Sequence, residues 1–266
     1  MKVADYIVKY LADYGVDDMF VVYGAANGDL IDAFVRTDNT RYISVIHEQG
    51  GGFAAEGWAK IKGIPSVSMA TSGPGGMNFV TPIGNFFYDS IPGIFITGQI
   101  NSRFMRPDES IRQIGFQETD IVSIVKPITK YATLIEKPED VKYELEKAIH
   151  MATEGRPGPV LLDIPLNIQK AEIDVDTLIG YDGDIKTKFD EDIINEQIDT
   201  FLEDLKNSER PCLMIGNGVR LSGAVDELLE LGKELKIPMF PTWNALDIVC
   251  SDYEYYGGRI GTYGGA

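Results

Sequence analysis

The sequence predicts an α/β protein: a doubly wound, mostly parallel sheet with helices on both faces, followed by the beginning of a second α/β domain. Short apolar runs rich in β-branched residues alternate with longer stretches in which apolar residues recur every three or four positions, as in successive βαβ units. Small-residue turns at 24–28 and 71–76 follow two of these runs. Open α/β sheets place such turns between the end of a strand and the start of a helix.

The first expected elements follow from the spacing of apolar residues. Val3, Ile7 and Leu11 recur at helical spacing, and Gly15 follows as a stop signal, so a helix over 3–14 is expected. The next segments alternate between extended apolar runs and helical patterns. They predict strands at 18–23 and 42–46, and helices at 30–35 and 48–62.

The rest of the first domain continues this alternation. A polar, irregular segment at 101–113 interrupts it, and Pro127 ends a short helix that follows 116–120. Pro138, with two acids after it, suits the first turn of another helix. The expected strands lie at 65–70, 93–98, 131–135 and 160–164, and the longer helices at 77–88 and 138–153.

The chain is expected to divide into two domains. The doubly wound domain should span 1–167, because acids then accumulate over 168–191 with glycines between them, as is typical of a linker. Residues 192–266 would begin a second domain with only about two strands, too few to bury a core alone. Either partner chains complete this domain or the sequence is a fragment. Its expected elements are helices at 192–205 and 222–235 and strands at 211–215 and 238–242.

Charge and composition exclude several classes of function. The formal net charge is −17 over 266 residues, which opposes the attraction that general nucleic-acid binding needs. No apolar run approaches the roughly 20 residues that span a bilayer, and the N-terminus carries no signal-peptide core. We therefore expect a cytoplasmic protein with no membrane partner. Two histidines and two distant cysteines argue against a zinc framework or a His-rich metal site.

Glu48 is the first candidate site residue. It stands at the start of a predicted helix, after the apolar run 42–46 and before the small residues of 50–55. Small residues let other backbone approach closely, so the surrounding structure would position this carboxylate. The alternative is a first-turn acid that is favoured only by the helix macrodipole. The turn 71–76 is a second candidate, because ligands of open α/β sheets bind at such turns.

Several separated motifs agree with one known family. In chain order they are Gly15-Val16-Asp17, Tyr23-Gly24, His47-Glu48-Gln49, Thr71-Ser72-Gly73-Pro74-Gly75, Asp89-Ser90-Ile91-Pro92, Thr97-Gly98-Gln99, Gly115-Phe116-Gln117-Glu118 and Gly155-Arg156-Pro157-Gly158-Pro159. The combination resembles the thiamine-diphosphate-dependent enzymes of the acetolactate synthase type. It runs through nearly the whole chain and is more specific than any single motif.

The resemblance implies a domain organisation and a set of cofactors. Residues 1–167 would be the pyrimidine-binding domain for thiamine diphosphate, and 192–266 the start of a Rossmann-like central domain, which binds FAD in some relatives. The accompanying Mg²⁺ would be held by a diphosphate-binding domain with no counterpart in this sequence, so none of its ligands is expected here. That domain would lie in a missing C-terminal part or in a partner subunit, and a homodimer or tetramer is implied.

The resemblance also implies roles for individual residues. The glutamate that matches Glu48 bonds to the aminopyrimidine ring of the cofactor and promotes the imino tautomer that removes the C2 proton. Gln117 would approach the active centre as a second catalytic residue. The loop Gly24-Ala25-Ala26 would border the reacting carbon. The family more often has Pro-Gly-Gly in this first loop, where this chain has Ala26-Asn27-Gly28. The pyrimidine pocket would be lined by Thr71, Gly73, Pro74 and Asn78.

The segment 101–113 is longer and more basic than acetolactate synthases usually show. In this respect the chain resembles relatives encoded with surface-polysaccharide genes, some of which transfer an acetyl unit from pyruvate to a keto-sugar nucleotide. Arg103, Arg106 and Arg112 would then meet an anionic acceptor. The alternative is that they lie on a solvated loop.

The function implied by this resemblance is decarboxylation of pyruvate, or of another 2-oxoacid, with carboligation to an acceptor. One alternative is the pyrimidine-domain subunit of a split 2-oxoacid decarboxylase. A second alternative is a non-catalytic paralogue that binds a partner or a nucleotide through the inherited fold. The presence of Glu48 counts against this second alternative.

Overall fold

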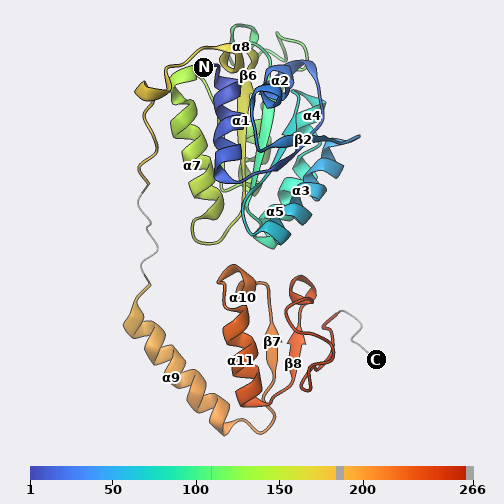
Figure 1. The fold of residues 1–266 in the computed structure, drawn as a ribbon, viewed down its shortest axis with the longest axis vertical. Helices are drawn as coiled ribbons and strands as arrows, with labels where there is room; N and C mark the ends of the chain where they lie inside the picture. Colours follow the sequence, from blue (N-terminus) through green and yellow to red (C-terminus); the bar gives the residue numbers. More distant parts are fainter. Residues whose placement is uncertain (109, 184–188, 262–266) are drawn as a thin grey trace. The chain divides into compact units, whose positions relative to one another are not determined.

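The computed structural model describes residues 1–108, 110–183 and 189–261 (Figure 1). The chain forms two compact units, Met1–Ile185 and Lys186–Ala266. Each unit has its own cluster of buried apolar side chains. No helix within the described ranges is long and apolar enough to cross a membrane.

The first unit is built on a six-stranded parallel sheet with the strand order β2-β1-β3-β4-β6-β5. β2 lies on one side of β1, and β3 lies on the other side. The topological switch point therefore lies between β1 and β3, where such sheets bind ligands outside the strand ends. The strands are β1 (Asp18–Val21), β2 (Arg41–Ser44), β3 (Ser66–Ala70), β4 (Gly93–Gln99), β5 (Tyr131–Leu134) and β6 (Pro159–Pro165).

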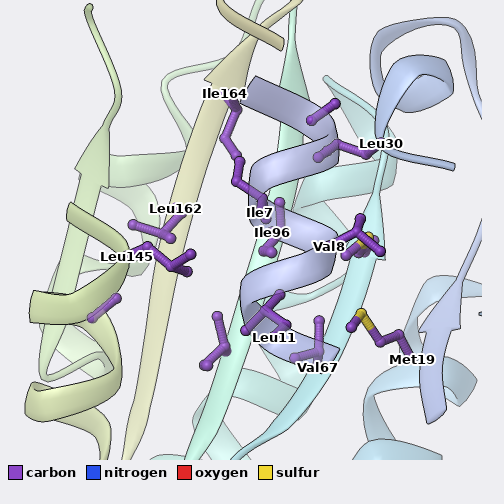
Figure 2. Close-up of a cluster of buried hydrophobic side chains, with 14 of the residues drawn as sticks. Ile7, Val8, Leu11, Met19, Leu30, Val67, Ile96, Leu145, Leu162 and Ile164 are labelled. Atoms are coloured by element: carbon purple, nitrogen blue, oxygen red, sulfur yellow. The ribbon is translucent and has the colours of Figure 1, made fainter. Parts of the chain in front are cut away.

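Helices cover both faces of this sheet, and the predicted doubly wound α/β fold is confirmed. Ile94 and Ile96 of β4 pack into one buried cluster with α1 (Val3–Tyr14), α2 (Gly28–Ala33), α7 (Val141–Thr153) and α8 (Leu166–Lys170). Phe95 packs into the other with α3 (Glu48–Lys62), α5 (Val80–Asp89) and α6 (Ile121–Val125). This is the alternation that a strand buried on both faces requires. Figure 2 shows the first cluster, with Ile7 and Leu11 of α1 lying over the sheet.

The helices of the first unit match several of the predicted ranges. Those expected over 3–14 and 48–62 are found with these bounds, and both end at a left-handed glycine, Gly15 and Gly63. The helices are α1 (Val3–Tyr14), α2 (Gly28–Ala33), α3 (Glu48–Lys62), α4 (Pro74–Met77), α5 (Val80–Asp89), α6 (Ile121–Val125), α7 (Val141–Thr153) and α8 (Leu166–Lys170).

The predicted start of the helix over 77–88 is wrong. Two helices occupy this region, α4 and α5, and Asn78 and Phe79 separate them. Pro74 takes the first position of α4, where its fixed φ angle suits a helix and its missing N–H costs nothing. Helical backbone thus begins directly at the small-residue turn, close to the predicted site.

The first unit also extends past the boundary expected at 167. Ile168 and Gln169 of α8 are buried. The backbone of the next residues is tied to the N-terminus, where Val3 N donates to Ala171 O (3.0 Å) and Ile173 N to Met1 O (2.9 Å). The acidic composition of 168–191 therefore does not mark a free linker along its whole length. Residues 184–188 of the expected linker lie outside the described residues.

The second unit contains a two-stranded parallel sheet of β7 (Leu213–Ile215) and β8 (Met239–Pro241). Its helices are α9 (Glu191–Asn207), α10 (Gly218–Leu221) and α11 (Val225–Leu235). The helix expected over 222–235 starts later, because Gly223 adopts a φ of +72° after α10. The buried cluster of this unit consists of Ile215, Met239, Ala245, Ile248 and Val249.

Candidate active site

Glu48 is the first residue of α3, and its side chain is only 9% exposed. Its Oε2 accepts a hydrogen bond of 2.9 Å from Asn78 Nδ2, at the junction of α4 and α5. The helix start is capped by another residue, because His47 Nδ1 accepts a 3.2 Å hydrogen bond from Gln49 N. The Glu48 carboxylate is therefore turned toward α4, and it has a more specific environment than a first-turn acid needs.

The turn between β3 and α4 brings three predicted residues together. Gly73 has a φ of +63°, and a Cβ at this position would lie 2.8 Å from Gln117 Cβ and 2.9 Å from Gln117 O. A Cβ at Gly75 would come within 2.8 Å of Thr71 Cγ2 and 3.3 Å of Glu48 Oε1. Only residues without a side chain allow this approach. The glycines thus bring Glu48, Thr71 and Gln117 to one turn.

The loop after β1 packs against the same turn. Ala26 N donates a 3.1 Å hydrogen bond to Thr71 Oγ1. Within the loop, Gly24 N donates to Oδ1 of the fully buried Asn27 (2.8 Å). A Cβ at Gly24 would lie 2.4 Å from Thr71 Cβ. The loops after β1 and β3 are therefore in contact at the switch point of the sheet.

The structure brings most of the predicted residues together. Ala25 and Pro74 lie in the same two turns, but their side chains are exposed. Gln117 is also exposed and has a left-handed backbone, with a φ of +60°. The predicted residues linked by these contacts, through Gly75 and the turn backbone, are Gly24, Ala26, Glu48, Thr71, Gly73, Asn78 and Gln117.

The Ala26 carbonyl is also held by Gln169, a residue that the sequence analysis did not select. Gln169 Nε2 of α8 donates hydrogen bonds of 2.7 Å to Ala26 O and to Ile164 O. The backbone of β4 also passes close by, since a Cβ at Gly98 would lie 1.9 Å from Ala26 O. No local sequence signal marked Gln169, which lay in the expected linker.

A buried acid lies at the ends of β4 and β6, next to this loop region. Asp163 is 2% exposed, and its two oxygens accept hydrogen bonds from Thr97 Oγ1 (2.7 Å) and Gln99 Nε2 (2.9 Å). Burial raises the pKa of Asp163 to about 7, although the two hydrogen bonds act in the opposite direction. An acid within an otherwise apolar strand was the signal that sequence reasoning passed over.

A cavity of about 300 Å³ lies beside Asp163, and its lining includes Gln99, Glu118 and Asp120. Met105, Arg106 and Asp108 of the predicted arginine segment also line it. Arg106 N donates to Glu118 Oε1 (2.7 Å), and the Arg106 guanidinium lies 3.9 Å from the same oxygen. Arg103 stacks over the Phe104 ring at 4.5 Å. Arg103 is therefore engaged within the segment 101–113, and Arg106 is engaged with Glu118 beyond it.

Asp163 is expected to make stability depend on pH in one direction. Its pKa is about 7 in the folded chain, against an ordinary value of 3.8, so between these values the folded state binds a proton that the unfolded chain has lost. Its contribution to stability should therefore fall as the pH rises through this window, by at most about 1.4 kcal/mol per pH unit. Thermal unfolding of the wild type and of Asp163→Asn across about pH 4 to 8 measures this. Parallel stability curves for the two proteins would contradict it.

The described residues contain no group of three or more His, Cys, Asp or Glu side chains that could hold a metal ion. Cys212 and Cys250 are both free and exposed. The polar groups brought together at the site are the Glu48 carboxylate, the Asn78 amide and the polar groups of the two small-residue turns.

Comparisons with known proteins identify the family of the chain. Residues 1–124 match the N-terminal TPP binding domain of thiamine pyrophosphate enzymes, and residues 198–266 match their central domain. The chain is 36% identical to the acetolactate synthase large subunit of Corynebacterium glutamicum, over 99% of this chain and 41% of that protein. It is 36% identical to the chloroplastic acetolactate synthase of Arabidopsis thaliana (99% and 38%) and 32% identical to the acetolactate synthase isozyme 2 large subunit of Escherichia coli (99% and 46%). The chain thus spans less than half the length of these relatives.

Proposed function

Because the chain belongs to the thiamine pyrophosphate enzymes, we propose that it supplies the half of an active site that binds the aminopyrimidine end of thiamine diphosphate. The reaction served would be decarboxylation of pyruvate, or of another 2-oxoacid, with carboligation to an acceptor. The observation that carries this proposal is the placement of Glu48, a buried carboxylate at the switch point of the sheet, bonded through one oxygen to Asn78.

The surroundings of Glu48 fit an aminopyrimidine. Its second oxygen, Oε1, takes no hydrogen bond from any described residue and lies beside Gly75, where a Cβ would come within 3.3 Å. A glycine here lets the turn pack against Thr71 and approach the carboxylate with no side chain between them. When bound, thiamine diphosphate supplies the carbon nucleophile and the electron sink that decarboxylation of a 2-oxoacid requires.

Each of the site residues of this chain would have its own role in the reaction. Glu48 shares a proton with a ring nitrogen of the cofactor, which is general acid–base catalysis by a carboxyl group. Asn78 fixes the orientation of that carboxyl, and Thr71 and Gly73 line the pocket. Gln117, which touches Gly73, reaches the reacting end of the substrate, and the loop Gly24-Ala25-Ala26 borders it.

The remaining parts of the machinery would lie outside this chain. Mg²⁺ and the diphosphate would be held by a diphosphate-binding domain, and a cytoplasmic homodimer or tetramer would bring that domain to Glu48. A flavin on the central domain would meet the turn Gly216-Asn217-Gly218, where a Cβ added to either glycine meets nothing within 4 Å. This open turn supports a bound nucleotide but does not specify one.

The proposal is tested by measuring CO₂ release from pyruvate with the full-length natural protein that contains this sequence. Release should require thiamine diphosphate and Mg²⁺ together and should cease when either is withdrawn. A panel of 2-oxoacids then defines the donor. A folded protein that releases no CO₂ from any 2-oxoacid with both cofactors present would contradict the proposed function.

A further inference from the structure

Gln99 is the last residue of β4, and every polar group of its buried amide is used. Its Nε2 donates to Asp163 Oδ2 (2.9 Å) and to the backbone carbonyl of Thr119 (2.8 Å). Its Oε1 accepts from Ile100 N (2.9 Å). The side chain thus connects the carboxyl end of β4 to the loop at 116–120. The two residues that it joins, Gln99 and Thr119, are 20 positions apart in the sequence.

The amide of Gln99 has only one workable orientation. Turning it over would place Oε1 against the Thr119 carbonyl, which is an acceptor, and Nε2 against the Ile100 N–H, which is a donor. Asp163 is itself fixed, because it is buried and also accepts a hydrogen bond from Thr97 Oγ1 (2.7 Å). Gln99 is therefore a rigid donor aimed at one backbone carbonyl of the loop.

The loop that Gln99 holds is the one that presents Gln117. Gln117 has a φ of +60°, a backbone conformation that residues with a side chain rarely adopt. A Cβ at Gly73 would lie only 2.8 Å from the Cβ of Gln117 and 2.9 Å from its carbonyl oxygen. Such a conformation persists only where the neighbouring structure maintains it. The Gln99 to Thr119 hydrogen bond fixes the chain two residues after Gln117.

We propose that Gln99 is a positioning residue of the active site, which is anchored on Asp163 and holds Gln117 against the Gly73 turn through the Thr119 carbonyl. This inference rests on the proposed function, because it assumes that Gln117 serves the reaction. In this role Gln99 acts through Gln117 and does not itself touch substrate or cofactor.

A double-mutant cycle in the full-length natural protein tests this. Gln99→Met removes all three hydrogen bonds at similar volume, and Gln117→Ala removes the positioned side chain. Each should lower kcat for CO₂ release by up to about 10²-fold, as displacements of about 1 Å do, while the affinity for thiamine diphosphate stays near that of the wild type. The double variant should be no slower than Gln117→Ala, because the two residues act as one unit.

Tyr131→Phe provides the matched control. It removes the hydrogen bond between Tyr131 and Glu144 and should leave kcat unchanged. Tyr131 begins the edge strand β5 and is in register with Ile94, at the opposite end of β4 from Gln99. Hydrogen exchange at the amides of 116–119 should accelerate in Gln99→Met and stay at the wild-type rate in Tyr131→Phe. This readout does not depend on turnover, so it reports on the loop even if the natural protein shows no 2-oxoacid chemistry.

The outcomes separate the two proposals. The absence of cofactor-dependent CO₂ release from the wild-type protein would contradict the proposed function. Three results would each overturn the role of Gln99 alone: losses in kcat that multiply in the double variant, a Gln117→Ala variant with unchanged kcat, or unchanged exchange at 116–119 in Gln99→Met.

Discussion

Replacing Glu48 with glutamine is expected to lower kcat for CO₂ release by about 10²–10⁴-fold, the usual contribution of a general acid or base. Glutamine has nearly the same shape and can still accept the hydrogen bond from Asn78 Nδ2 that Glu48 Oε2 accepts at 2.9 Å. It cannot share a proton with a ring nitrogen as a carboxyl can. The loss should therefore appear in turnover and hardly in the unfolding free energy.

The measurement compares kcat and thermal unfolding of Glu48→Gln and the wild type. Glu56→Gln is the matched control, because Glu56 lies on the same helix but bonds to Lys60 and Asn85, each at 2.6 Å, away from the pocket. This control should keep wild-type kcat. A Glu48→Gln variant with wild-type turnover would show that the carboxylate is not the acid or base of the site.

Replacing Gly98 with alanine should have the largest effect on stability among the glycines near the site. The added Cβ would lie 1.9 Å from Ala26 O and 2.9 Å from Asn27 N, and both atoms are backbone. Ala26 O also accepts the 2.7 Å hydrogen bond from Gln169, so the loop cannot move without breaking it. We expect a loss of about 3 kcal/mol in unfolding free energy, at the upper end for overpacking, and weaker binding of thiamine diphosphate.

Gly57→Ala is the control for this change. Gly57 lies within α3, and a Cβ there would meet nothing within 4 Å. Alanine has the higher helix propensity, so this variant should be more stable by about 1 kcal/mol. Equal stability and equal cofactor affinity for Gly98→Ala and the wild type would contradict the close packing of the loop on β4.

The fold could be predicted because its signals are local. The spacing of Val3, Ile7 and Leu11 and the glycine stops at 15 and 63 define two helices to the residue. The alternation of strands and helices then implies a parallel sheet with two covered faces. Where the prediction failed, as at α4, a proline at the first helical position begins a separate short helix inside the expected turn.

The site could be predicted only in part. Glu48, Thr71 and Gly73 stand in turns that follow strands, and their positions along the chain mark them as candidates. Gln99, Asp163 and Gln169 act through contacts with residues 20 to 143 positions away. Such contacts are set by which strands become neighbours in the sheet, and no spacing within one segment contains that information.

The role of Glu48 is tested most directly by a structure of the full-length natural protein with thiamine diphosphate bound. We predict that a Glu48 carboxylate oxygen lies about 2.6–3.2 Å from a nitrogen of the aminopyrimidine ring, with Asn78 still bonded to the other oxygen. A structure in which the cofactor binds elsewhere, or in which Glu48 faces solvent, would contradict this role.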